Sequence, residues 1–280
     1  MAPTPRRGAR TTLPWPALVL AIIAVAFFAL PLLGLLWRAP WSNAWSYLTA
    51  HDSLVALRLS LWCSLWATVL SLLFGVPLAW LLARVEFAGR SVVRALCLLS
   101  MVLPPVVGGV ALFFALGRRG LVGQWLDRWF DIRLPFTTAG VVVAQTFVAM
   151  PFLVITVEAA LRQHDVRIDE AAGTLGASRW YTFRRVTLPA VRPAVVAGAV
   201  LAWARALGEF GATITFAGNF PGTTQTLPLA VYLALDTNPE QAIVLALVLI
   251  AVSFAVLLGL RDRWWGGARA RRVDATRWWS

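Results

Sequence analysis

The sequence DEAAGTLGASRWYTFRRVTLP, residues 169–189, is the longest polar segment of an otherwise apolar chain. It begins with two acids and two alanines, which suit the first turn of a helix. Gly173 and Gly176 make continuation costly, so this first helix should be short. A second, amphipathic helix follows, with apolar residues on one face and arginines outside it, and Pro189 should end the unit. The pattern predicts two short helices, rimmed by arginine and held against a membrane.

The rest of the chain has the composition of a membrane protein. Of its 280 residues 59% are hydrophobic and only 14% are charged, whereas a soluble domain has about 25% charged residues. Runs of roughly 20 apolar residues are long enough to span hydrocarbon. The sequence therefore predicts an all-α polytopic membrane protein with six transmembrane helices. The predicted spans are 13–36, 54–83, 95–116, 138–161, a run that begins near 194, and 241–260.

The positive charge is distributed unevenly along the chain. All 25 basic residues are arginine and the net charge is +12, which in a soluble protein would suggest nucleic-acid binding. Here most arginines fall in a few short segments between apolar runs, as the positive-inside rule requires of cytoplasmic loops. We therefore expect no nucleic acid as partner, and a multi-pass protein of the plasma membrane. The expected parts are a cytoplasmic tail at 1–12, one membrane domain at 13–260 with a central inner loop at about 162–192, and a basic cytoplasmic tail at 261–280.

Two of the predicted spans contain residues that are costly in a membrane. The third carries Pro104-Pro105 and Gly108-Gly109, and such breaks need neighbouring protein or water to satisfy the freed backbone groups. The fifth carries Arg205 and Glu209, and each charge at mid-membrane costs about 3 kcal/mol. The two lie four residues apart on one helix face and can pair. A structural ion pair and the lining of a hydrophilic path both remain open.

Catalytic chemistry finds little support in the sequence. There is no phosphate-binding G-x-x-x-x-G-K-[ST] motif, so the usual ATP site must be on another subunit. The two cysteines fall in apolar runs and form no C-x-x-C pair, and the two histidines fall in opposite loops. We expect no catalytic residues, no metal and no cofactor. A proton-coupled secondary carrier is the alternative function, because Arg205 and Glu209 could take part in proton transfer. Such carriers usually show internal sequence repeats, and the sequence shows no internal repeat.

The central loop resembles a known motif. Glu170-Ala171-Ala172, then Gly176, then Val186-x-Leu188-Pro189, is similar to the EAA loop of ABC-importer permeases. The resemblance implies a type I ABC-importer permease fold and a coupling helix seated in a groove of a cytoplasmic ATPase. An ordinary amphipathic connector is the alternative. The coupling residues that the motif implies are Glu170, Ala171, Ala172, Gly176, Leu188 and Pro189.

A second resemblance concerns the substrate. The stretches ARALGEFGAT (204–213), FAGN (216–219) and TQTLPLAVY (224–232) resemble the permeases of molybdate importers, and the likeness extends over about 54–260. Sulfate/thiosulfate permeases share the Gly-Glu-Phe/Tyr-Gly core but differ more in 216–232, so they, or a tungstate permease, are the alternative.

This resemblance also implies a set of partners. They are a second copy of the chain in a homodimer, two ATPase subunits that hydrolyse ATP, and an extracytoplasmic oxyanion-binding protein, all in a lipid membrane. A tetrahedral dianion needs a polar path with positive charge or amide donors. The candidates for that path are Arg205, Gly208, Glu209 and Gly211.

Overall fold

The computed structural model describes residues 15–269, and every regular element in that range is a helix. The expectation of an all-α polytopic chain is confirmed. The elements are α1 (Trp15–Arg38), α2 (Ala44–Thr49), α3 (His51–Arg84), α4 (Arg90–Val102), α5 (Pro105–Leu116), α6 (Gly123–Phe130), α7 (Thr138–Gln163), α8 (Val166–Thr174), α9 (Arg179–Thr182), the π-helical turn η1 (Phe183–Thr187), α10 (Leu188–Leu207), α11 (Gly211–Phe216), α12 (Leu227–Thr237) and α13 (Pro239–Arg269).

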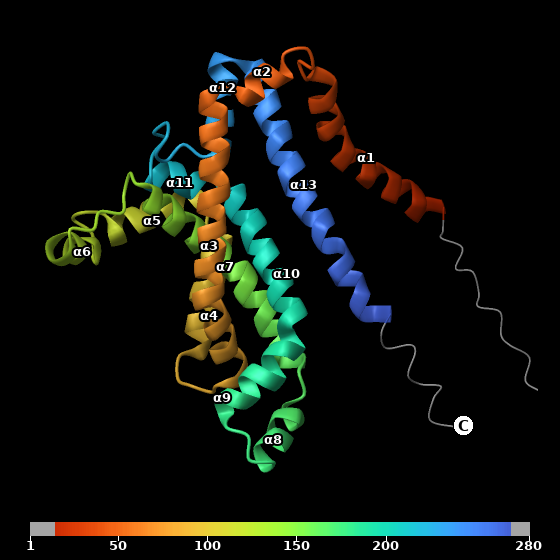
Figure 1. Cartoon of the computed structure of the whole chain (residues 1–280), viewed down its shortest axis with the longest axis vertical. Coiled ribbons are helices and arrows are strands. Elements are labelled where there is room, and N and C mark those ends of the chain that lie inside the picture. The colour runs from red at the N-terminus through yellow and green to blue at the C-terminus, as the bar shows by residue number, and fades with distance from the viewer. Residues whose placement is uncertain (1–14, 270–280) are drawn as a thin grey trace, which may run out of the picture.

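Helices α3, α7 and α10 form the central bundle (Figure 1). Small side chains at the contacts let helix backbones approach closely inside a membrane. Gly75 of α3 shows this, because a Cβ there would lie 2.9 Å from the side chain of Leu153 on α7. The buried face of α3 repeats every three or four residues: Ser53, Ala56, Ser60, Cys63, Ser64, Ala67, Thr68, Ser71, Gly75, Ala79 and Leu82.

The third predicted span is not one continuous helix. Among the described residues five helices are long and apolar enough to cross a membrane, one fewer than the six continuous spans expected. The third span is divided into α4 and α5 at Leu103 and Pro104, whose backbones are extended with ψ near 136° and 131°. Proline disfavours the helical conformation of the residue before it, and Pro104-Pro105 applies that restriction twice. Pro105 is then tolerated near the start of α5, where its missing N–H costs nothing.

The helix after the central loop begins earlier than expected. Pro189 was expected to end the amphipathic unit, but α9, η1 and α10 follow one another without a gap, so that prediction was wrong. In η1 the N–H of Leu188 donates to the carbonyl of Phe183, five residues back. Such wider turns occur within α-helices, and this one ends two residues before Pro189, which has no N–H to donate. The helical path therefore continues through Pro189 into the membrane.

The two ends of the bundle are formed by different elements. Helices α8 and α9 lie at one end, and α2 and α12 lie at the other, while α1 and α13 diverge from the bundle (Figure 1). Helix α12 lies between the predicted fifth and sixth spans, and α13 continues to Arg269, beyond the predicted end of the last span at 260. The expected tail at 1–12 lies outside the described residues, as does the part of the basic tail after 269.

Candidate coupling loop and membrane path

Helix α8 has a local signal at each end. At its start the Asp165 side chain accepts a hydrogen bond of 3.0 Å from the N–H of Arg167. At its end Gly176 has φ +85°, its N–H donates to Gly173, and the N–H of Ala177 donates to Ala172. These two bonds form a Schellman motif, which needs a left-handed residue and so favours glycine. Gly176 therefore ends α8, whereas Gly173 is accommodated within it.

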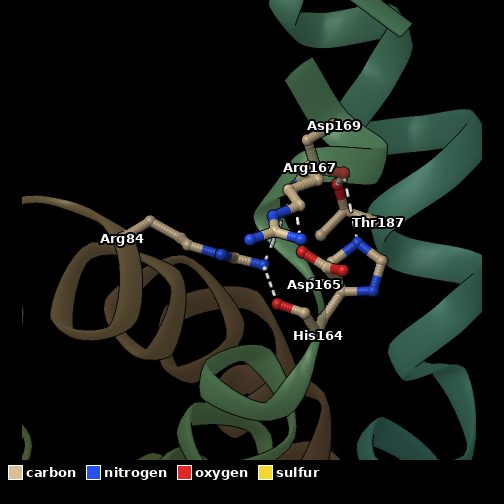
Figure 2. Close-up of polar contacts among 6 residues, drawn as sticks. All are labelled: Arg84, His164, Asp165, Arg167, Asp169 and Thr187. Carbon is tan, nitrogen blue, oxygen red and sulfur yellow. Dashed lines mark hydrogen bonds and ion pairs between the residues drawn. The ribbon is translucent and has the colours of Figure 1, made fainter. Parts of the chain in front are cut away.

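The side chain of Asp169 ties α8 to three other segments (Figure 2). Its Oδ1 accepts a 3.0 Å hydrogen bond from the hydroxyl of Thr187 in η1 and lies 3.1 Å from Nε2 of His164, the residue that follows α7. Its Oδ2 lies 3.7 Å from Nη2 of Arg84 at the end of α3. The same Arg84 nitrogen donates to the carbonyl of His164 at 3.2 Å. We call these four residues the Asp169 cluster.

The Asp169 cluster joins all three helices of the central bundle to α8. Arg84 ends α3, His164 follows α7, and Thr187 immediately precedes α10. The side chains of Arg84, His164 and Asp169 are 14%, 9% and 23% exposed, so the contacts are largely shielded from water. Sequence reasoning assigned Asp169 only a place at a helix start. His164 is only five residues away, but Thr187 and Arg84 are distant in sequence, so no local pattern could have identified those two partners.

The remaining surface of α8 is accessible. Glu170 and Ala171 are exposed and Ala172 is half-buried, so the first predicted coupling residues face outward while Asp169 faces the bundle. Large apolar side chains accompany them, including Leu175 with 89% of its surface exposed. A soluble monomer rarely exposes such a group of apolar side chains without a partner. Leu188 is half-buried and Pro189 is exposed. Both lie at the start of α10, which η1 separates from α8 and α9 along the chain.

Arg205 and Glu209 lie side by side at the end of α10, as their spacing predicts. Nη1 of Arg205 lies 2.6 Å from Oε2 of Glu209, although the N–H groups are not aimed at that oxygen as in a hydrogen bond. The other oxygen, Oε1, accepts a 2.7 Å hydrogen bond from the N–H of Ala212 at the start of α11. Glu209 is 1% exposed and the Arg205 side chain 26%. The carboxylate therefore holds α11 in place, and the guanidinium reaches accessible space.

The glycines of this region differ in their surroundings. A Cβ on Gly211 would lie 2.9 Å from the Pro105 side chain, so Gly211 lets α11 cross closely over α5. Gly109 of α5 has the same function, because a Cβ there would collide with Thr215 and lie 2.8 Å from the carbonyl oxygen of Ala212. For Gly208, in contrast, the only described atom near such a Cβ is a carbonyl oxygen of its own helix, at 3.7 Å. Of the three, Gly208 alone has room beside it.

Several buried polar atoms near these helices have no hydrogen-bond partner among the described residues. Both polar atoms of Gln145 on α7 are unpaired, and its side chain is fully buried. The same holds for single atoms of Thr213, Asn219 and Thr226, which follow Glu209 along the chain. Unpaired buried polar groups cost about 1–3 kcal/mol each and call for a partner such as water or an ion. Sequence reasoning missed these residues because an isolated glutamine or threonine in an apolar run carries no signal.

No group of three His, Cys, Asp or Glu side chains within the described range is arranged to hold a metal ion. The candidate functional residues of the described range form two groups. One is an exposed short helix anchored to the ends of three membrane helices. The other is a buried charged and polar region between α7, α10 and α11.

Comparison with known proteins gives a consistent result. The molybdenum transport system permease protein ModB of Mycobacterium tuberculosis is 47% identical over 255 residues, which cover 90% of this chain and 96% of that protein. The sulfate transport system permease protein CysT of Escherichia coli is 36% identical over 221 residues, 79% of each chain. A chain of a bacterial ABC transporter involved in the import of alginate superposes with a TM-score of 0.69 at 21% identity, covering 93% of this chain and 95% of that one.

These likenesses confirm the expected ABC-importer permease fold, in a protein whose relatives are non-catalytic membrane subunits. A family model described as "binding-protein-dependent transport system inner membrane component" matches residues 75–265, which include the whole candidate coupling loop and the Arg205–Glu209 pair. The chain belongs to this family of inner-membrane components of binding-protein-dependent transport systems.

Proposed function

We propose that this chain is the permease subunit of an ATP-driven importer of molybdate. The assignment of molybdate as the substrate rests on the difference in sequence identity, which is 47% to a molybdenum permease and 36% to a sulfate permease. Sulfate or thiosulfate and tungstate are the alternative substrates, since these ions share the charge and tetrahedral shape of molybdate. A proton-coupled carrier receives no support from the family match.

The coupling role belongs to α8 and the turn that follows it. We assign contact with a separate ATPase to Glu170, Ala171, Ala172 and Gly176, because their surface is accessible while Asp169 anchors the helix from behind. Leu188 and Pro189 would continue this contact at the start of α10. When two ATPases close on ATP, they would move α8, and the Asp169 cluster would pass that motion to the central bundle.

The membrane path would follow the polar region beside Arg205. Its guanidinium offers positive charge, and Gly208 leaves room beside it. The paired Glu209 reduces the net charge, which suits a path that must release its ion as well as admit it. Gly211 would shape the path only indirectly, through its contact with α5. A homodimer would surround the path, with an extracytoplasmic oxyanion-binding protein delivering the ion.

Uptake by reconstituted vesicles tests the substrate. The vesicles would carry the permease in their membrane and the ATPase with ATP inside, and the binding protein and molybdate would be added outside. We expect ATP-dependent molybdate uptake that a large excess of sulfate does not reduce. Tungstate competition would measure how far the selectivity extends. Sulfate uptake without any response to molybdate would contradict the proposal.

The proposed orientation places both termini and α8 in the cytoplasm. Single cysteines at Ser42 and Thr223, in a cysteine-free background, should react with an impermeant thiol reagent added outside. Both residues are exposed and precede α2 and α12, the helices that lie at the end of the bundle opposite α8 (Figure 1). A cysteine at Ser178, the exposed residue that begins α9, should react only after the membrane is permeabilised. Labelling of position 178 from outside would reverse the orientation.

A further inference from the structure

Two arginines share one carboxylate where α4 packs against α7. Arg94 of α4 places Nη2 and Nε at 2.7 and 3.1 Å from Oε1 of Glu158 on α7. Arg162, one turn further along α7, places Nη2 at 2.8 Å from the same oxygen. The Glu158 side chain is 9% exposed, whereas those of Arg94 and Arg162 are 31% and 46% exposed. The cluster therefore has one more positive charge than its carboxylate can balance, and the excess lies on the accessible side.

These charged side chains line a cavity of about 280 Å³ whose other walls are apolar. Leu98 of α4 and Val154 and Ile155 of α7 form much of that wall, and the thiol-bearing Cys97 also lines the cavity. The cavity is thus cationic at one end and hydrocarbon-like along the rest. An anion that is attached to an apolar chain matches both parts, whereas a soluble anion matches only the first.

We propose that this cavity binds an anionic phospholipid, with its phosphate at Arg94 and Arg162 and its first acyl carbons along Leu98 and Ile155. Basic pockets between transmembrane helices on the cytoplasmic side are suited to anionic headgroups. The cavity is lined by Leu82, two residues before the end of α3, and Arg84 at that end contacts Asp169 of α8. The cavity therefore lies towards the α8 end of the bundle, which is the inner face in the proposed orientation. A zwitterionic lipid fits less well because its ammonium group would lie near the guanidinium groups.

Changes to Arg162 and to the Glu158 carboxylate should alter lipid binding in opposite directions. Arg162→Gln removes one cationic contact while Arg94 continues to pair with Glu158, so the fold should persist. It should weaken binding of the anionic lipid about fivefold, the effect of one arginine near an anionic membrane surface. Glu158→Gln removes the competing carboxylate and should strengthen the same binding. If the arginines served only to neutralise Glu158, neither change would alter lipid binding.

The experiment uses the purified permease without its ATPase, so its result is independent of the transport proposal. Delipidated protein in detergent is titrated with dioleoylphosphatidylglycerol or dioleoylphosphatidylcholine, and bound lipid is counted by native mass spectrometry. The alkylation rate of Cys97 gives a second readout, because Cys97 lines the cavity and is only half-buried, whereas Cys63 is fully buried. Arg192→Gln is the matched control, since Arg192 is exposed on α10 and does not line the cavity.

We expect phosphatidylglycerol, but not phosphatidylcholine, to slow alkylation of Cys97 in the wild type and in the Arg192 control. Arg162→Gln should shift the protecting concentration about fivefold upward. Equal protection by both lipids would overturn the proposal, as would an unchanged titration in Arg162→Gln. Protection by glycerol 3-phosphate at the same concentration would show that a free phosphate suffices and would also overturn it. Full protection of Cys97 without any added lipid would indicate that a second copy of the chain covers the cavity instead.

Discussion

Replacing Asp169 with asparagine should loosen the attachment of α8 to the membrane helices while leaving its outer face intact. Asparagine keeps the shape and one acceptor oxygen but removes the charge. A hydrogen bond to a charged group contributes about 1.5–3 kcal/mol and one between neutral groups about 1 kcal/mol, so the bond from Thr187 weakens by about 1 kcal/mol. The Arg84 contact at 3.7 Å is partly exposed and adds no more than about 1 kcal/mol.

The expected loss of about 2 kcal/mol corresponds to roughly a 30-fold shift in the equilibrium between attached and detached α8. The assay is the number of molybdate ions transported per ATP hydrolysed in reconstituted vesicles, together with ATPase binding to the permease. We expect the transport ratio to fall several-fold and ATPase binding to remain, because Asp169 faces the bundle and Glu170 faces outward. A double-mutant cycle with Thr187→Val should show a coupling energy of about 1 kcal/mol, as expected for residues in contact.

Asp165→Asn is the matched control for this prediction. It makes the same chemical change four residues earlier, and asparagine begins a helix as well as aspartate does. Within residues 15–269 the Asp165 side chain bonds only locally, to the N–H of Arg167 (Figure 2), so coupling should stay near the wild-type value. If Asp169→Asn behaved like Asp165→Asn, or if it abolished ATPase binding, the Asp169 cluster would not be the connection between α8 and the bundle.

Three further predictions concern other parts of the molecule. Arg205→Ala or Glu209→Ala alone should reduce membrane expression or transport, because the partner charge is left in the membrane. The double change should recover part of that loss, and strictly additive losses would rule out a functional pair. Gly109→Ala should destabilise the purified protein by about 1–3 kcal/mol in thermal unfolding, since the new Cβ would approach the carbonyl oxygen of Ala212 to 2.8 Å; an unchanged melting temperature would show that α5 and α11 can separate. Hydrogen bonds from two arginines, mainly Arg133, hold the pKa of Asp127 below its usual range. The stabilising contribution of Asp127 should therefore be complete at neutral pH and lost as pH falls below about 4. The melting temperatures of wild type and Asp127→Asn should then converge in acid, and a difference that persisted at low pH would contradict this.

Much of the membrane architecture could be predicted because it depends on local sequence. A run of about 20 apolar residues must satisfy its own backbone groups, so it forms a helix wherever it lies. The pairing of Arg205 and Glu209 was likewise predictable, because residues four apart on a helix meet regardless of the surrounding fold. The third span shows the limit of this reasoning. Two prolines indicated a disturbance there, but the separation into α4 and α5 depends on what each half packs against.

The roles of individual site residues were less predictable than their positions. The sequence predicted the same helix-breaking effect for Gly173 and Gly176, whereas Gly173 lies within α8 and Gly176 ends it through its left-handed backbone. Gly211 was proposed as part of the path, whereas in the structure it is a packing residue against Pro105. Glycine has several uses, and the sequence does not distinguish a positive φ from a close contact.

The sequence by itself determined the class of this protein: apolar runs, the arginine distribution and the EAA-like loop specify a permease, because hydrophobic length, charge and short motifs are properties of contiguous residues. Only the tertiary structure decided which side chains act together. The Asp169 cluster joins residues from position 84 to position 187, and the cationic cavity joins Arg94 to Glu158 and Arg162. Local spacing brings Glu158 near Arg162 and His164 near Asp169. Arg84, Arg94 and Thr187 join them only when separate helices pack, and the energy of that packing is not contained in any local pattern.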